Sequence, residues 1–147
     1  YLISLNLLEL GGYRLFEHAT LNRLVSVSLR LDKLSQAQAY MTRAETLVID
    51  IDLLKQKCEH SITASELLLT EGSCHEAIRE AERTIQLARA LGSIEHEWPS
   101  MLVKARALQN MGMLGQSREA LKECVETIER ASADIVTDEA LSLNQSS

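Results

Sequence analysis

Two stretches of this chain, 43 residues apart, have closely similar sequences. Residues 72–85 and 115–128 carry the same Gly, Glu, Ala, Glu, Thr and Ile at six matched positions, and Ala77 is matched with Ala120. A fainter copy at residues 32–41 places Ala37 40 residues before Ala77. An internal period of this length is typical of repeat architectures, in which one supersecondary unit recurs along the chain.

The residue pattern within each copy predicts helices. Only 3% of the residues are aromatic and a single proline serves 147 residues, while Leu, Ala and Glu, which favour helix, are abundant. Small and apolar residues recur at the helical spacing of three and four. The two stripes are Ala77, Ala81, Thr84, Ile85 and Ala88, and then Ala120, Cys124, Thr127, Ile128 and Ala131. The chain is therefore predicted to be all-α and built from paired amphipathic helices.

The predicted map has three helix pairs and about seven helices. Residues 1–12 are expected to be the end of a preceding repeat helix, closed by Gly11 and Gly12, so that the chain would start inside a repeat of a longer protein. The pairs are expected at 13–49, 52–91 and 97–132, within a repeat region of 13–133. Residues 134–147 are predicted to be a capping helix or a flexible tail.

Helix ends are predicted from turn and cap residues. Gly72 and Gly115 should lie in turns, and Gly92 should end a helix. Asp50 or Asp52 is expected to cap the helix that follows, Ser73 to cap the next, and Pro99 to lie in a first turn.

The turn regions resemble the tetratricopeptide repeat, whose pattern is Gly-x-Tyr-x-x-Ala. Matching segments are Gly72-x-Cys74-x-x-Ala77, Gly115-x-Ser117-x-x-Ala120 and Asp32-x-Leu34-x-x-Ala37. The resemblance covers about residues 13–132 and implies antiparallel helix pairs stacked into a right-handed superhelix. Two departures stand out: the period is 40 to 43 residues where the family has 34, and Cys74, Ser117 and Leu34 replace the turn aromatic. The resemblance therefore implies longer, degenerate repeats.

The resemblance also implies a concave groove, lined by the first helix of each pair, that binds other proteins. The expected lining residues are Asn22, Arg23, Ser26, Arg30, Glu59, Thr63, Glu66, Thr70, Arg106, Gln109 and Met113. Members that bind chaperone peptides hold a terminal carboxylate in a basic clamp, which Glu59 and Glu66 would oppose. Trp98 is expected to anchor one repeat on the next, with a binding role as the alternative if it is exposed.

Composition argues against several other partners. A net charge of −6 and a pI near 5.2 disfavour nucleic acid, whose binding depends on clustered Lys and Arg. The apolar runs are far shorter than the roughly 20 residues of a membrane span, and no secretory signal opens the chain. Cys58, Cys74 and Cys124 are an odd, widely spaced set, which favours a reducing intracellular compartment, cytoplasm or nucleus.

No catalytic, cofactor or metal motif is recognised in the sequence. The histidines have no nucleophile at a familiar spacing, Cys58-x-His60 and Cys74-His75 lack the further ligands of a zinc site, and no glycine-rich phosphate loop occurs. The sequence therefore favours a non-enzymatic scaffold, one segment of a larger multiprotein-complex subunit, for example of cell-cycle or ubiquitin-ligase type. The alternative is a regulatory arm of a larger enzyme or of a signal-responsive transcription activator.

Overall fold

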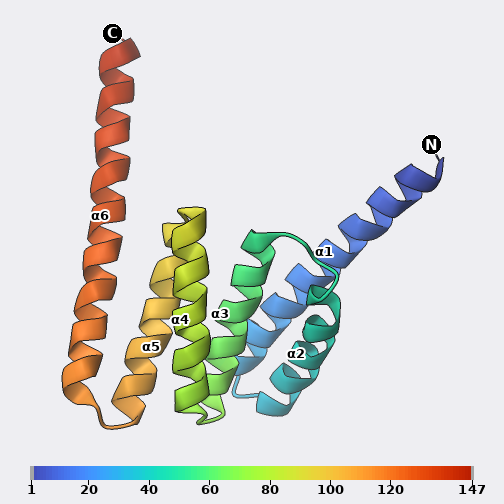
Figure 1. The fold of residues 1–147 in the computed structure, drawn as a ribbon, viewed down its shortest axis with the longest axis horizontal. Helices are drawn as coiled ribbons and strands as arrows, with labels where there is room; N and C mark the ends of the chain where they lie inside the picture. Colours follow the sequence, from blue (N-terminus) through green and yellow to red (C-terminus); the bar gives the residue numbers. More distant parts are fainter. Residues whose placement is uncertain (1, 147) are drawn as a thin grey trace.

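Six helices make up the part of the chain that the computed structural model describes, residues 2–146, with side chains placed for residues 11–143 (Figure 1). No strand occurs among these residues, so the predicted all-α class is confirmed over them. The helices are α1 (Leu2–Arg30), α2 (Leu34–Val48), α3 (Leu54–Thr70), α4 (Cys74–Leu91), α5 (Ile94–Asn110) and α6 (Leu114–Ser146).

Three tight turns of the same geometry join α1 to α2, α3 to α4, and α5 to α6. Each has one residue in the left-handed region: Asp32 at φ 58°, Gly72 at φ 83° and Gly112 at φ 78°. In each turn, the N–H of the next residue donates to a carbonyl five residues back, as in a Schellman motif. These bonds are Lys33 to Ser28 at 2.8 Å, Ser73 to Leu68 at 2.9 Å and Met113 to Leu108 at 2.9 Å. The turns therefore recur every 40 residues.

This spacing corrects the alignment of Gly72 with Gly115. The structural counterpart of Gly72 is Gly112, whereas Gly115 lies in the first turn of α6. A shift of three residues is close to one helical turn, so it still matches small residues to the buried face of the helix. Ala120 is 8% exposed and Cys124 is 4% exposed, so the 43-residue alignment also pairs buried residues with buried residues.

Both ends of the chain differ from the predicted map. Gly11 and Gly12 lie inside α1 and do not end a helix, and α6 continues without a break past residue 132, so six helices replace the seven predicted. Interior glycine costs a helix only about 1 kcal/mol, and good helix formers flank this pair. Residues 116–146 contain no Gly or Pro that would end α6.

Of two predictions for helix ends, the one before α3 is wrong and the one after α4 is confirmed. The residue before α3 is Leu53, with no side-chain cap, while Asp50 pairs with Arg14 at 3.8 Å and Asp52 pairs with Lys57 at 3.9 Å. Gly92 ends α4 in the left-handed conformation, as predicted.

The predictions for Ser73 and Pro99 are met only in part. Ser73 precedes α4 without making a side-chain cap bond, and Pro99 is the sixth residue of α5 because that helix already begins at Ile94.

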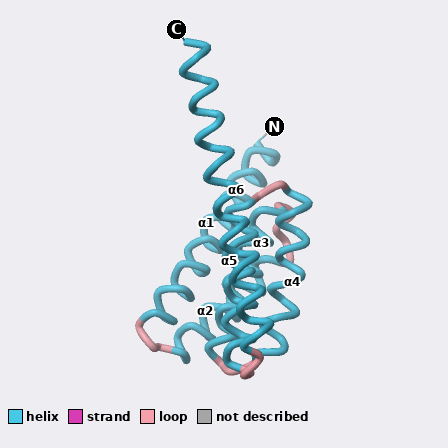
Figure 2. The backbone as a smooth tube through the Cα atoms, turned by 90° about the vertical axis from the view of Figure 1, so that its left-hand side faces the viewer, coloured by secondary structure: helices cyan, strands magenta, loops and turns pink. Residues whose placement is uncertain are grey.

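The helices pack in chain order (Figures 1 and 2). Each helix of a pair lies antiparallel to its partner, and the odd-numbered helices α1, α3 and α5 contact one another in turn. Fully buried alanines allow this close approach, among them Ala37, Ala44, Ala77, Ala81 and Ala88. The contact between α4 and α5 is the most extensive in the chain, and that between α2 and α3 is among the smallest.

The two terminal helices extend beyond this body (Figure 1). α1 has 29 residues and α6 has 33, compared with 15 to 18 in the other four. Every side chain of residues 132–143 is exposed.

Candidate binding face

The residues predicted to line a groove lie on three neighbouring helices, α1, α3 and α5, except Met113, which lies in the turn after α5. Their exposure varies. Arg23, Arg30, Thr70, Arg106, Gln109 and Met113 are exposed, and Ser26, Glu59 and Glu66 are half-buried. Asn22 and Thr63 are buried, which corrects the expectation that both line an open surface. Those two side chains are covered by packing between helices, which a one-helix register cannot show.

Glu66 of α3 lies within electrostatic reach of two predicted lining residues on the helices either side, Arg106 of α5 and Arg30 of α1. Burial raises the pKa of the Glu66 carboxyl, and the two guanidinium groups oppose that shift. Two cations thus accompany one carboxylate across three helices. Glu66 is therefore not an isolated negative charge, and its repulsion of an acidic partner is offset at this end of the face.

A chain of hydrogen bonds joins α1 to α3 through two histidines. Gln56 Nε2 lies 2.8 Å from His18 Nδ1, and His18 Nε2 lies 2.9 Å from His60 Nδ1. Because the amide N–H of Gln56 can only donate, His18 accepts at Nδ1, carries its proton on Nε2 and donates to His60. His60 then carries its own proton on Nε2. The arrangement requires both rings to be neutral with this one tautomer.

Burial favours the neutral form of these two histidines. It lowers the pKa of His18, with the carboxylate of Glu59 acting weakly in the opposite sense. It lowers the pKa of His60 to about 4, and the neighbouring His18 adds to that shift. Both rings are thus uncharged near neutral pH, as the hydrogen-bond chain requires.

A second polar bridge joins α3 to α5. His96 Nε2 lies 3.4 Å from Glu59 Oε1, and the Ser93 hydroxyl bonds to His96 Nδ1. His96 is the 40-residue counterpart of Gln56, and each of these side chains reaches back to the preceding odd-numbered helix. The same position in successive repeats therefore forms the polar part of each stacking contact.

The sequence indicated no catalytic or metal role for the histidines and did not predict these bridges. One signal was present: Gln56 and His96 are polar residues one 40-residue period apart, each on the inner side of a helix. With the period fixed at 40, that recurrence would have marked the position.

Asn22 of α1 is buried with neither side-chain oxygen nor nitrogen hydrogen-bonded to any described residue. A buried amide without partners costs about 1–3 kcal/mol. Because both amide atoms are buried, Asn22 lies beneath the face that Arg23 and Ser26 line and is not part of its open surface.

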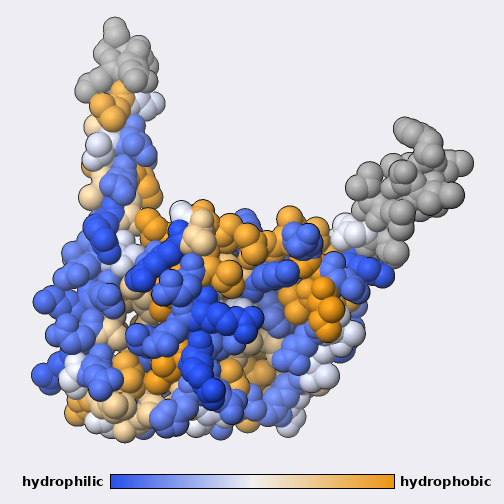
Figure 3. Space-filling view, viewed as in Figure 1, coloured by the Kyte–Doolittle hydropathy of each residue, from blue (hydrophilic) through white to orange (hydrophobic). Residues whose placement is uncertain are grey.

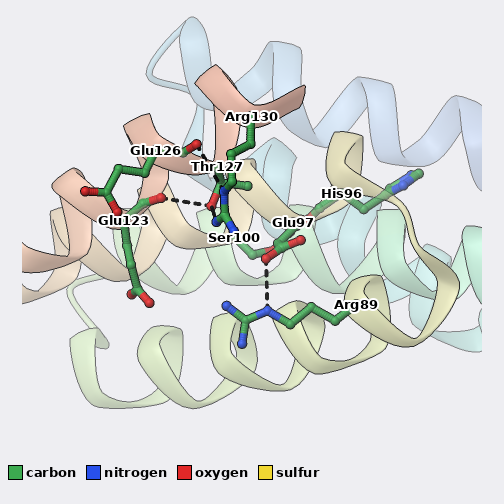
Figure 4. Close-up of polar contacts among 8 residues, drawn as sticks. All are labelled: Arg89, His96, Glu97, Ser100, Glu123, Glu126, Thr127 and Arg130. Atoms are coloured by element: carbon green, nitrogen blue, oxygen red, sulfur yellow. Dashed lines mark hydrogen bonds and ion pairs between the residues drawn. The ribbon is translucent and has the colours of Figure 1, made fainter. Parts of the chain in front are cut away.

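Trp98 of α5 is 38% exposed and lines a cleft of about 640 Å³ between the start of α5 and the second half of α6. Its backbone carbonyl accepts a bond from the Cys124 thiol at 3.5 Å. Beside it, Arg89 Nε of α4 donates to Glu97 Oε1 of α5 at 2.9 Å (Figure 4). Trp98 thus contributes both to packing between α5 and α6 and to an open surface.

Metal binding and thiol chemistry are the other possibilities for the described residues. Among the described side chains, no group of three or more His, Cys, Asp and Glu could hold a metal ion. Cys58 and Cys124 are buried, and burial raises the pKa of both thiols, which keeps them protonated and weakly nucleophilic. Of the helices within residues 2–146, none combines the length and apolar character needed to cross a bilayer.

Comparison with protein-family models, with curated proteins and with solved structures gave no match to this chain.

Proposed function

We propose that this chain is a tetratricopeptide-like stack of helix pairs that binds another protein across α1, α3 and α5 and has no catalytic role. The 40-residue recurrence of the turns at Asp32, Gly72 and Gly112 supports a repeat of helix pairs. The contacts between successive odd-numbered helices support a continuous face. Such stacks serve as extended binding surfaces, because each repeat adds one helix to the same side.

The observation that carries the proposal is a charged set on three successive odd-numbered helices, Arg30 of α1, Glu66 of α3 and Arg106 of α5. A protein segment laid across the helices meets positive, negative and positive groups in turn. We infer a partner segment of mixed charge, with carboxylates placed to meet the two arginines.

In this proposal the chain is one segment of a subunit in an intracellular multiprotein complex, in the cytoplasm or nucleus, for example of cell-cycle or ubiquitin-ligase type. Its partners are other subunits or peptides rather than nucleic acid or membrane. The net charge of −6 supports this assignment, because it repels phosphate backbones and anionic lipids.

The test is affinity capture with cross-linking, followed by a direct binding measurement with each purified partner. The face variant is Arg30→Glu with Arg106→Glu. The matched control is Arg79→Glu with Arg118→Glu, the same charge change at exposed sites of α4 and α6. We expect the face variant to lose at least about tenfold in affinity for partners that the control retains, since two charge pairs become repulsive. Equal binding by both folded variants would contradict the proposed face.

A further inference from the structure

Two stripes of exposed apolar residues run along the two terminal helices. On α1 the stripe is Tyr13, Phe16, Leu24, Val27 and Leu31, which ends in the turn after the helix, and on α6 it is Leu121, Val125, Ile128 and Val136. Within each stripe the residues recur every three, four or seven or eight positions, so they share one side of the helix. Hydrophobic residues are visible among the hydrophilic ones along α6 in Figure 3. Apolar stripes of this length on a protein surface mark an interaction site.

The α6 stripe occupies positions that the next helix covers elsewhere in the chain. The 40-residue counterparts of Leu121, Val125 and Ile128 are Ala81, Ile85 and Ala88 of α4, which are 0%, 7% and 0% exposed. Ala81 packs with Val103 of α5, and Ile85 packs with Met101 of α5. The stripe on α6 therefore has the position of a surface that receives a following odd-numbered helix.

The α1 stripe occupies the complementary position. The counterparts of Val27 are Leu67 of α3 and Ala107 of α5, which are 6% and 0% exposed. Leu67 packs with Ala37 and Met41 of the preceding α2, and Ala107 packs with Ala77 and Ala81 of the preceding α4. Val27 is 49% exposed. The α1 stripe at Val27 therefore has the position of a surface that docks on a preceding even-numbered helix.

We infer that a second copy of this chain docks head to tail, with α1 of one copy on α6 of the next. This contact would continue the packing that already joins α4 to α5 within one chain. In that packing the odd-numbered helix runs antiparallel to the even-numbered helix before it (Figure 1). The beginning of α1 therefore lies beside the end of α6.

The lengths of the two terminal helices fit this arrangement. The helices with 29 and 33 residues are the two that meet, and the extra length of each is at the end that faces the other. The exposed end of α6 carries apolar side chains, Ile135, Val136 and Leu141, whose burial against a packing partner is favourable. Docking on α1 of a second copy supplies one along its apolar side at Val136.

Charge favours this contact over a symmetric one between two α6 helices. α6 carries seven carboxylates and three cations, whereas α1 carries three arginines, Arg14, Arg23 and Arg30, with two glutamates, Glu9 and Glu17. Two α6 helices in contact would repel, and α6 against α1 would attract. A head-to-tail contact uses different surfaces on the two copies, so copies can continue to add as an open chain or close into a ring.

The experiment measures molar mass by sedimentation and light scattering on the full chain, from roughly micromolar to millimolar concentration. Val27→Glu blocks the α1 stripe and Val125→Glu blocks the α6 stripe. Ile49→Glu is the matched control, since Ile49 is 80% exposed and lies in the connection after α2, on neither stripe. Circular dichroism checks that all variants stay folded.

We expect the wild-type chain and the Ile49→Glu control to exceed the mass of one chain as concentration rises. Each blocked variant alone should stay at the mass of one chain, with association weakened by more than about tenfold because a carboxylate must be buried among apolar side chains. An equimolar mixture of the two should stop at two chains, because one intact α1 stripe meets one intact α6 stripe.

Three results would overturn the inference. A wild-type chain that remains monomeric throughout the range would assign the stripes to a different occupant. Loss of association in only one of the two variants would indicate a symmetric contact, α6 with α6 or α1 with α1. A mixture with no two-chain species would exclude complementary stripes. None of these results bears on the α1, α3 and α5 face, which is tested separately by partner binding.

Discussion

The molecule contains two junctions between helix pairs, and they are unequal. The first joins the α1–α2 pair to the α3–α4 pair through residues 49–53, and the second joins α3–α4 to α5–α6 through residues 92–93. Contact between α2 and α3 is slight, whereas contact between α4 and α5 is extensive. The same 40-residue unit thus gives two different contacts.

The side chains at the two junctions differ in kind. The first contains the bonded rings of His18 and His60 and the unpaired amide of Asn22 next to an apolar cluster. The second contains the His96 to Glu59 bridge as its polar part but is otherwise mainly apolar, with Val103 and Met101 buried. The Arg89 to Glu97 bond lies at its exposed side. Backbone periodicity therefore determines where two helix pairs meet. The polarity of a few side chains determines how stable each contact is and how its stability depends on pH.

The largest expected effect concerns the second junction. Met101 is 4% exposed and packs with Ile85 and Cys124, so it joins α4, α5 and α6. Met101→Ala should lower the free energy of unfolding by about 2–5 kcal/mol through lost burial and a cavity. Urea unfolding measures this, with Met113→Ala at an exposed site as the control, expected to change less than about 0.5 kcal/mol. Equal losses in the two variants would show that this junction is not a packed core.

The next effect is a pH dependence of the first junction. Burial holds the pKa of His60 at about 4 in the folded chain, below its ordinary value of 6.5, so the unfolded chain binds more protons between these two pH values. Its contribution is therefore complete above about pH 6.5 and is lost as pH falls toward 4, by up to about 3 kcal/mol. The lowered pKa of His18 acts in the same direction, whereas the raised pKa of Glu66 acts in the opposite one.

The measurement is the free energy of unfolding of wild type and His60→Gln between pH 7 and about pH 4. Glutamine does not titrate, so the difference between the two proteins isolates the ring. His75→Gln, at an exposed site, is the matched control and should keep the wild-type pH profile. A His60→Gln profile identical to that of wild type would mean that the ring is solvated and its pKa ordinary.

The smallest effect sharpens the first junction by removing its unpaired amide. Asn22→Leu replaces a buried group without hydrogen-bond partners by an apolar one of similar size, and should raise the free energy of unfolding by about 1–2 kcal/mol. Thermal and urea unfolding measure this gain. Ser26→Leu, one turn further along α1 at a half-buried site, is the comparison and should give a smaller gain. A loss of stability in Asn22→Leu would show that the amide makes a bond through water.

Much of the middle of the fold could be read from the sequence. The pair predicted at 52–91 ends where α4 ends, the pair predicted at 13–49 ends one residue beyond α2, and Gly92 ends α4 as expected. The ends could not be read in this way. Gly11 and Gly12 carry a strong turn signal by composition, yet a helix accepts them at modest cost when the residues on both sides favour helix.

The sequence predicted only part of the candidate binding face. Arg30, Glu66 and Arg106 were selected one helix at a time, and the structure places the two arginines on either side of the carboxylate. The sequence did not predict the burial of Asn22 and Thr63 or the bond between His18 and His60. Both depend on how one helix lies on another.

The sequence by itself determined the helices of the middle of the chain and the small residues on their buried faces, because those depend on local propensity and on the 3.6-residue period. Only the tertiary structure decided which repeats are in register, at 40 residues rather than 43, and which polar side chains meet. The physical reason is that a slip of nearly one helical turn leaves the apolar pattern of a helix almost unchanged, whereas a hydrogen bond such as that from His18 to His60 forms in one register alone.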